Sequence, residues 1–581
     1  MAETESSRIT KLTSWWKLTE DNSFLKNYRA RDEENRLFYL GGSGQWDKES
    51  LKLLKAEGRP ALTINGILPA VDLISGFERQ NRQDIKVYPR KGGNHQIALI
   101  LTELAKHTMD TSNGNYEQSA VFTDGIIGSK GWMSMDISYE NDPRNGDIVI
   151  KKEQAKHIRE DPYSKEYDLN LSARFIVKDY WWDEETIKLN YPKANLKGDL
   201  GVESESGEIV PDDTDSYQEE NMHAAMNARY NDQSNRNKYR IKEWYWKSYE
   251  RRTFLINVVN LDFVQIDKTK IDLIKKIMAK FKKGTFVEQE RIVPVLHKTV
   301  TVGELELENI DDPFNGISLY PLFRFCPYWL DGVAMGKIDN LKDPQREKNK
   351  RRSQALHYLN SISDGWVYEQ GSITNPDDLD IPHANIEYKA GKQAPGRKPM
   401  PQLSVGHLAL SEKGADDIKE ISGANNSLQG MVEDRGESGK TVEKRQMGGA
   451  LIQEPVMDNW HYTQQIFATA LIEVIRRSNV YSKEEIKAIV DESTIKPEDK
   501  VDMDKLRDFK TGRYGIKISN SPSMPTARAA NFASMLQAVE MGMPLMQIAP
   551  DLVVEASDWP SKKEIADRFK KLQKQQQGQP Q

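Results

Sequence analysis

The chain has 581 residues, more than one hydrophobic core usually supports, so roughly two to four structural units are expected. Its hydrophobic share of 38% is low, but 12 Trp, 22 Tyr and 16 Phe exclude a disordered chain. The formal net charge of −6 excludes DNA binding by bulk charge, so any basic contact with DNA has to be local.

The first 200 or so residues carry the pattern of an α+β domain. The first 60 residues are charged and predict mostly helix, and residues 96–108 place four apolar side chains on one helical face. Alternating apolar residues over 133–139, followed by the Asn145-Gly146 turn, predict a β-hairpin. Residues 171–182 indicate a further strand, which a short helix follows.

The middle of the chain turns from an acidic loop to a β-rich pattern. Residues 198–216 are acidic and rich in Gly and Ser, which predicts a loop, and apolar residues at helical spacing follow. Strands are predicted over YRIKEWYW and RRTFLINVV, with a helical stretch at 271–283. Residues 299–308 alternate cleanly, with Gly303 as a candidate bulge. The block 239–325 therefore looks like a compact β-rich module inserted between helices.

Residues 341–361 predict a helix with a basic first half. Asp343 can cap this helix, with Pro344 at its first position. Its candidate DNA-channel or inter-subunit residues are Lys342, Arg346, Lys348, Lys350, Arg351 and Arg352. The commoner interpretation of such a run is a solvated face with intrahelical ion pairs. Because aromatic residues are not interleaved with the basic ones, phosphate contact without base reading is the functional expectation.

The C-terminal part is mainly helical. Residues 364–410 are rich in Gly, Pro, Asp and Lys, which predicts a long irregular segment before helices that start near 411. A long helix ending at Arg477 carries one apolar stripe, made of Trp460, Phe467, Leu471 and Val474. Shorter helices are predicted at about 482–491 and 526–541, before a low-complexity tail.

One motif suggests nucleotide binding but is incomplete. GESGKT at 436–441 lacks the glycine that a phosphate-binding loop needs at position 434, where Asp434 stands. A carboxylate there would repel a triphosphate, and no apolar strand precedes the motif. We therefore interpret it as a turn that caps the following helix.

The sequence shows no pattern for a metal site or a nucleophile. The nine His residues are scattered, and the single cysteine, Cys326, excludes an intrachain disulfide. Cys326 lies between aromatic residues, which favours a buried, unreactive thiol. Asp212-Asp213 and Asp311-Asp312 are interpreted as solvated turn acids. We predict no catalytic, cofactor-binding or metal-binding residues, no signal peptide and no membrane span, with assembly in a reducing compartment.

Several stretches, in this order along the chain, resemble the portal proteins of short-tailed (podovirus-type) bacteriophages. They are QWDKESLKLLKAEGRPALTINGILPAVDLISGFERQNRQDIKVYP (45–89), RFIVKDYWWDEETIKLNYP (174–192), LKDPQREKNKRRS (341–353), SGANNSLQGMVEDRGESGKTVEKRQMGG (422–449), SNSPSMPTARAANFASMLQAVE (519–540) and LVVEASDWPSKKEIADRF (552–569). The resemblance covers most of residues 45–570, and the shared order and spacing make it specific.

The resemblance implies a non-enzymatic ring of about twelve identical subunits at one capsid vertex. Double-stranded DNA is packaged and ejected through such a ring without sequence-specific contact. The implied partners are terminase, scaffolding protein, major capsid protein and the head-completion or tail proteins of the head–tail connector. The implied location is the virion, after assembly in the cytoplasm of the bacterial host, with no membrane.

The resemblance also implies a portal-type α+β fold with a wing, a two-helix stem, a β-rich clip and a helical C-terminal crown. The expected parts are the N-terminal wing (1–210), first stem helix (211–236), clip (237–330), second stem helix (331–362), channel loop and wing helices (363–480), and crown with C-terminal tail (481–581).

Two other classes of protein remain as alternatives. A DNA-packaging ATPase or nuclease would need an intact phosphate-binding loop or a carboxylate cluster for two metal ions. A soluble adaptor or scaffold would stay monomeric. Electron microscopy separates these classes from a portal, because only the portal forms a ring with a central hole.

Overall fold

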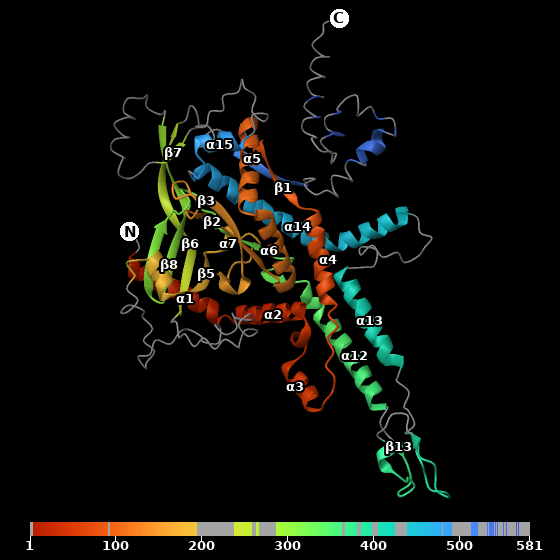
Figure 1. Cartoon of the computed structure of the whole chain (residues 1–581). Helices are drawn as coiled ribbons and strands as arrows, with labels where there is room; N and C mark the ends of the chain where they lie inside the picture. The colour runs from red at the N-terminus through yellow and green to blue at the C-terminus, as the bar shows by residue number, and fades with distance from the viewer. Residues whose placement is uncertain are drawn as a thin grey trace.

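The structure is a computed structural model of the whole chain. It describes residues 4–90, 93–194, 238–257, 263–265, 286–362, 366–379, 385–397, 405–423, 439–478, 480–490 and 513–520, with short pieces between 532 and 568. Figure 1 shows a broad α+β body from which a narrow helical arm projects. The coarse α+β prediction is confirmed.

The N-terminal region is helical, as predicted. Its elements are α1 (Glu5–Asp21), α2 (Ser23–Leu40), the 3₁₀ turn η1 (Gly42–Gln45), α3 (Lys48–Ala56) and α4 (Ile67–Gln80). Asn22 begins α2 by accepting hydrogen bonds from the backbone N–H groups of Phe24 and Leu25. Asp47 caps α3 in the same way, because its carboxylate accepts from the N–H of Ser50.

The main core lies between helices and a three-stranded sheet in the order β10-β2-β3. The elements around it are β1 (Gln83–Arg90), α5 (His95–Thr111), α6 (Gly114–Gly128), β2 (Gly131–Ser138), β3 (Asp147–Glu153), β10 (Leu322–Phe325) and α14 (Gly439–Arg477). The predicted hairpin is confirmed as β2–β3, and Gly146 in its turn has a φ of 75°.

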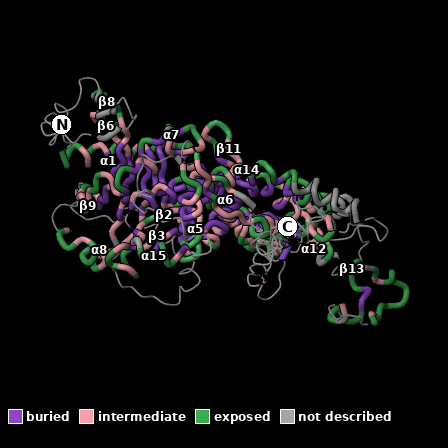
Figure 2. Tube along the Cα trace, turned by 90° about the horizontal axis from the view of Figure 1, so that it is seen from above, coloured by how far each residue is buried: buried purple, intermediate pink, exposed green. Residues whose placement is uncertain are grey.

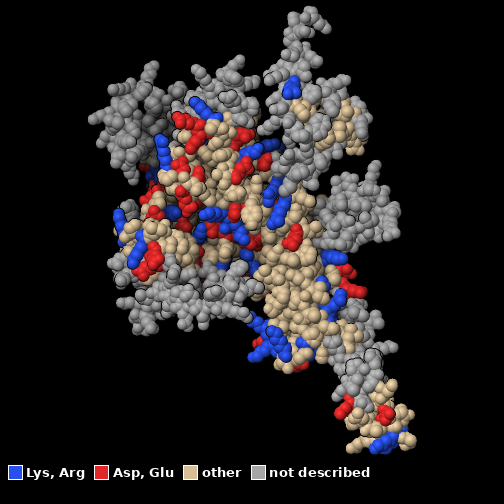
Figure 3. Space-filling model, viewed as in Figure 1, with Lys and Arg blue, Asp and Glu red and all other residues tan. Residues whose placement is uncertain are grey.

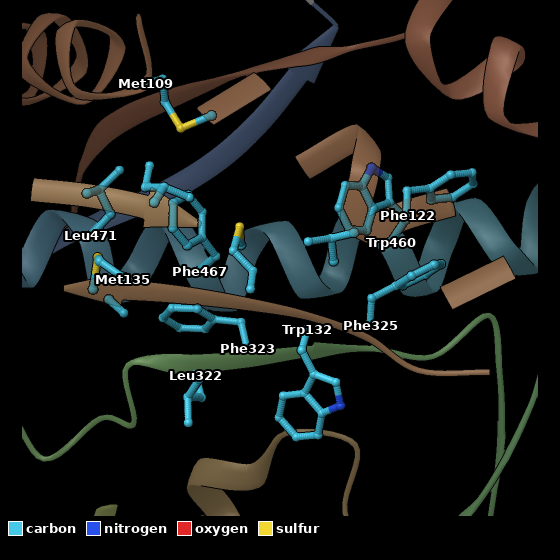
Figure 4. Close-up of a cluster of buried hydrophobic side chains, with 14 of the residues drawn as sticks. Met109, Phe122, Trp132, Met135, Leu322, Phe323, Phe325, Trp460, Phe467 and Leu471 are labelled. Atoms are coloured by element: carbon cyan, nitrogen blue, oxygen red, sulfur yellow. The ribbon is translucent and has the colours of Figure 1, made fainter. Parts of the chain in front are cut away.

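Aromatic side chains from three distant segments meet in this core (Figure 4). Phe122 of α6 stacks on Phe325 of β10 with ring centroids 5.2 Å apart, and Trp460 of α14 meets both rings edge-on. The apolar stripe predicted on the long C-terminal helix is buried throughout. The four apolar residues predicted on one face of 96–108 are also buried, in α5.

A second, six-stranded antiparallel sheet runs in the order β4-β5-β6-β8-β9, with β7 paired to β6. Its strands are β4 (Ile158–Glu160), β5 (Phe175–Asp183), β6 (Lys238–Asn257), β7 (Phe263–Gln265), β8 (Phe286–Val302) and β9 (Leu305–Asp311). Helix α1 packs on it, since Trp15 stacks on Phe175 at 4.7 Å and Trp16 lies 3.9 Å from the Arg159 guanidinium.

This sheet corrects several expectations. The two strands predicted from Tyr239 onward are one continuous strand, β6, of 20 residues. Gly303 is not a bulge but the turn between β8 and β9, with a φ of 58°, and the register shift falls at Val300/Thr301. Because β5 pairs with β6, the β-rich region shares its sheet with the N-terminal part of the chain. The predicted helices at 271–283 and after the acidic loop lie outside the described residues.

Shorter elements connect these layers. They are η2 (Ala155–His157), α7 (Leu169–Ser172), α8 (Glu184–Asn190), β11 (Tyr328–Leu330), β12 (Val333–Met335), η4 (Ile338–Asn340), α15 (Lys483–Ile489) and β15 (Arg513–Asn520). β15 pairs antiparallel with β1 over eight residues, so the C-terminal region completes a sheet begun near residue 83. The strand predicted at 171–182 starts later, at Phe175, because a turn of helix, α7, precedes it.

The arm consists of two antiparallel helices and a small tip. α12 (Lys342–Ile362) leads away from the body, and α13 (Val405–Ser422) returns along it. The tip contains β13 (Trp366–Val367), η5 (Pro376–Leu379), β14 (Gly396–Arg397) and a bridge between Ile373 and Tyr388. The segment predicted as irregular thus contains short paired strands, and the next helix starts at 405 rather than near 411.

The predicted start of α12 needs one correction. The helix already begins at Lys342, so Asp343 and Pro344 lie inside its first turn. The Asp343 carboxylate accepts a hydrogen bond from Arg346 at 3.0 Å instead of capping the helix. Pro344 is tolerated there because the first N–H groups of a helix have no intrahelical partner.

Candidate inter-subunit and DNA-channel surface

One face of α12 carries a buried polar stripe, made of Gln345, Asn349 and Ser353. The spacing of four residues places the three side chains above one another on the helix, and each is less than 5% exposed. They receive hydrogen bonds from the backbone N–H groups of Gly66, Ile64 and Leu62, at 2.9, 3.0 and 2.9 Å respectively. Segment 62–66, which is neither helix nor strand and leads into α4, is therefore held to α12 by side-chain hydrogen bonds.

The stripe extends into the body through Gln45. The Asn349 amide donates to Gln45 Oε1 at 2.9 Å, and Gln45 Nε2 donates to the Phe38 carbonyl at 2.8 Å. Gln345 Nε2 donates both to the Ile64 carbonyl and to Asn349 Oδ1. A buried network whose members are hydrogen-bonded in this way holds its elements in one arrangement. The root of the arm is thus fixed rigidly to α2 and the segment before α4.

Two of the six predicted basic residues, Lys342 and Arg346, join the arm to α2. Lys342 Nζ lies 2.5 Å from Glu34 Oε2, and only 9% of Lys342 is exposed. Arg346 donates to the other oxygen of Glu34, and its guanidinium lies 4.9 Å from the Phe38 ring centroid. These contacts use both cations inside the subunit, so their first role is structural.

The remaining four residues lie farther along α12, and two of them, Lys350 and Arg352, are exposed. Lys348 is half-buried beside α13, and burial, together with the nearby charges of Arg352 and Lys419, lowers the pKa of its ammonium. Arg351 pairs with Glu347 at 3.5 Å. Lys350 and Arg352 are exposed, and neither makes an ion pair with any residue that the structure describes. These two cations can reach a phosphate or a carboxylate of another molecule.

The sequence reasoning missed the polar stripe, although its signal was present. Gln, Asn and Ser recur at i, i+4 and i+8 along the same helix that carries the basic run. Polar residues at helical spacing are normally expected to face water. Their burial depends on segment 62–66, whose N–H groups need partners and which is almost 300 residues away in the chain.

A buried ion-pair triad holds the body together beneath α2. Glu160 accepts from Lys130 and from Arg324, each at 2.6 Å. Burial raises the pKa of the Glu160 carboxyl, but the charges of Arg324 and Lys130 outweigh it and lower this pKa to about 2. The Arg324 guanidinium also lies 4.0 Å from the Trp329 ring centroid. All three charges are compensated inside the protein.

Three strands of the second sheet carry a Ser–His–Asp chain that sequence reasoning did not find. Ser248 on β6 lies 2.6 Å from His297 Nε2, and His297 Nδ1 lies 2.7 Å from Asp311 on β9. Acyl transfer would also need free backbone N–H groups beside the hydroxyl. Ser248 instead lies within the continuous β6–β8 ladder, and the His297 ring stacks on Trp246 at 4.1 Å. The chain therefore links β6, β8 and β9 as a structural element.

The other residues considered at the sequence level form no reactive centre. Cys326 is fully buried, and burial raises the pKa of its thiol to about 11, which agrees with the predicted unreactive character. Asp311 pairs with His297, and Asp312 accepts from the Gly316 N–H. Asp212, Asp213 and the loop before Gly439 lie outside the described residues, and Gly439 itself begins α14.

The described residues contain neither a metal site nor a membrane span. No group of three or more His, Cys, Asp or Glu side chains among them is arranged to hold a metal ion. Likewise, within the described ranges, no helix combines the length and the apolar character needed to cross a bilayer.

Throughout the described body and the root of the arm, the charged and polar side chains discussed above hold helices and strands together. This arrangement is typical of a structural subunit. The chain belongs to the phage P22-like portal protein family, whose model matches residues 17–581. Portal proteins are structural, non-enzymatic components at a capsid vertex of the virion, and the family implies an oligomeric ring. The portal resemblance seen in the sequence is thereby confirmed. No curated protein matches the chain in a sequence comparison.

Proposed function

We propose that this chain forms a ring of about twelve subunits at one capsid vertex, through which double-stranded DNA is packaged and ejected. The observation that carries the proposal is the match of the portal family model to residues 17–581. The structural role of its charged clusters supports it, since they stabilise the subunit itself. In this function the ring provides the passage for DNA, and the energy for DNA movement comes from a separate terminase.

The arm is the part of the subunit that we assign to the stem. What supports this is the pairing of α12 with α13, two antiparallel helices that carry a small paired-strand tip at their far end (Figure 1). A helix pair of this kind suits a stem, and its tip, residues 366–397, suits the clip. This assignment differs from the one inferred from the resemblance, which placed the clip at 237–330. The sheet shared by β5 and β6 favours the later position.

DNA contact in this proposal is sparse. Arg352 is exposed on α12 and Arg351 beside it is partly exposed, and contact with phosphates by a few cations lets DNA slide without base reading. Terminase would dock at the tip of the arm during packaging, and head-completion or tail proteins would follow. Scaffolding and major capsid proteins would contact the body during capsid assembly. The crown remains assigned to 481–581.

The test is electron microscopy of the purified full-length protein, with a nucleotide-hydrolysis assay on the same sample. We expect closed rings with a central hole and no ATP turnover. Monomers under every condition tried would support the adaptor alternative and contradict the portal function. ATP turnover that is lost in Lys440→Ala would instead support the packaging ATPase.

A further inference from the structure

Helix α3 has an apolar side that nothing in the described chain covers. None of its nine residues is buried, although its sequence is strongly amphipathic. Leu53 is 59% exposed, and Leu54 lies partly exposed beside it. An isolated helix of this length is marginal in water, so its stability must come from packing against something else.

A groove runs between this side of α3 and the arm. Trp46, Leu53, Leu54 and Pro60 form its apolar lining, and Lys350 and Gln354 of α12 form the other wall. The volume of the groove is about 190 Å³, which leaves room for one or two aliphatic side chains. The Trp46 indole is fixed in the floor, because its N–H donates to Thr63 Oγ1 at 3.1 Å.

Two cations, Arg59 and Lys350, line the groove, and others lie elsewhere on α3. Lys52 and Lys55 of α3 are exposed, and Figure 3 shows Lys and Arg side chains gathered over this helix. Arg59 already pairs with Glu57 at 2.9 Å. Lys350 makes no ion pair with any described residue, although its charge acts on the Asp47 carboxyl at the start of α3, so of the two lining cations it is the more open to a carboxylate from outside.

The β11–β12 hairpin presents a matching knob. Leu330 is 67% exposed and Val333 is 37% exposed, on either side of the two-residue turn Asp331-Gly332. Both turn residues have positive φ, at 48° and 91°, which defines a tight type I′ turn and places one carboxylate between two apolar side chains. Figure 2 shows β11 at the outer edge of the body.

The knob is held rigidly from below. Arg31 of α2 donates to the Ala334 carbonyl at 2.6 Å, and Lys337 donates to the Tyr328 hydroxyl at 3.1 Å. Asn459 of α14 donates to the Pro327 carbonyl at 3.0 Å, which ties the base of the hairpin to the core helix. A projection that is already ordered loses little conformational entropy when it binds.

We propose that the Leu330–Val333 knob of one subunit inserts into the α3 groove of a neighbouring copy of this chain. This inference rests on the proposed ring. A ring needs two different surfaces that complement each other, because the same contact must repeat around the circle. The apolar pair of the knob fits the apolar lining, and Asp331 faces Lys350 at the rim. This complementarity of charge selects a second copy as the occupant.

Covalent trapping provides the first test. The double variant Leu330→Cys/Leu53→Cys is oxidised mildly after ring formation and analysed on a non-reducing gel. We expect a ladder of covalent multimers on the gel. Each variant with only one of the two new cysteines should give the monomer band alone, since the native Cys326 is buried. Rings that contain the double variant but yield no multimers would overturn the knob-and-groove contact and leave the portal function intact. If the unmodified protein forms no rings at all, both ideas fail.

Charge exchange provides the second test. Lys350→Glu places two carboxylates together, so we expect at least a tenfold weaker assembly constant, which Asp331→Asn in the same chain should partly restore. Asn is chosen because it tolerates the positive φ of this position. Leu189→Asp, at an 80% exposed site on α8, is the control that should assemble normally. Thermal melting of each monomer checks folding, and independent effects of the two charge changes would contradict direct contact.

Discussion

Asn349 of α12 accepts a hydrogen bond from the backbone N–H of Ile64 at 3.0 Å, across 285 residues of sequence. The Asn349 side chain thus satisfies a backbone N–H group of a segment that has no strand neighbour. Asn349 is only 1% exposed. If its side chain is removed, water does not readily replace it as the acceptor for the Ile64 N–H. The arm is therefore attached to the body by a specific polar contact in addition to apolar packing.

The first prediction concerns this attachment. Asn349→Ala leaves the Ile64 N–H and the Gln45 side chain without their partner, at a cost of about 1–3 kcal/mol for each buried group. We expect a large fall in the midpoint of denaturant unfolding. Arg352→Ala on the exposed face of the same helix serves as the matched control and should change stability by about 0.5 kcal/mol or less. Equal midpoints for the two variants would show that the stripe does not hold the arm.

The second prediction separates the structural cations of α12 from the accessible ones. Arg351→Gln/Arg352→Gln should leave the thermal midpoint nearly unchanged, because Arg352 is exposed and Arg351 makes only a surface ion pair with Glu347 at 3.5 Å. If these residues bind DNA, the slope of log affinity against log salt becomes shallower by about 0.9 for each phosphate that the variant no longer neutralises. Filter binding of assembled rings at several salt concentrations measures this slope.

The corresponding variant at the root of the arm behaves in the opposite way. Lys342→Met/Arg346→Met removes both partners of Glu34, so we expect lower stability. Its salt slope for DNA should match that of the unmodified ring. An unchanged slope for the Arg351/Arg352 variant would mean that these residues form only a solvated face.

The periodic parts of the fold could be predicted from the sequence. Helical spacing is clear in four apolar residues of α5: Ile97, Ile100, Leu101 and Leu104. This spacing places them on one side of a helix, and the structure buries that side in the core. The hairpin was equally clear, although its connection spans residues 139–146 and only Gly146 in the predicted Asn145-Gly146 turn has a positive φ, at 75°. Both features depend on residues close together in the chain.

The pairing of distant segments could not be predicted in this way. β15 joins β1 over eight residues, from Gln83↔Asn520 to Arg90↔Arg513, and neither strand has a pattern that selects the other. The contacts of Lys342 and Arg346 with Glu34 have the same origin, since any exposed acid could pair with a basic helix. Local spacing shows which residues can form ion pairs, whereas the fold decides which of them meet.

The third prediction concerns the single cysteine. Because burial raises the pKa of the Cys326 thiol to about 11, very little thiolate exists near neutral pH, and reagents cannot reach it in the folded protein. We expect no measurable reaction with a thiol-specific dye under native conditions and one thiol per chain in denaturant. Rapid labelling of the folded protein would show that the core around α14 opens readily.

The last prediction concerns Glu160, which lies between Lys130 and Arg324. Glu160→Gln leaves both cations buried without a counter-charge, and the loss of one partner from a buried pair costs about 3–5 kcal/mol. The folded pKa of about 2 lies below the value of 4.5 that an unperturbed glutamate has. The unfolded chain therefore binds a proton more readily, so the stabilisation is complete above about pH 4.5 and is lost as the pH falls toward 2. Denaturant unfolding of both proteins at pH 7, 4 and 3 measures this effect. The stability difference between them should shrink across that window, and a difference that stays constant with pH would mean that the Glu160 charge is not what stabilises the triad.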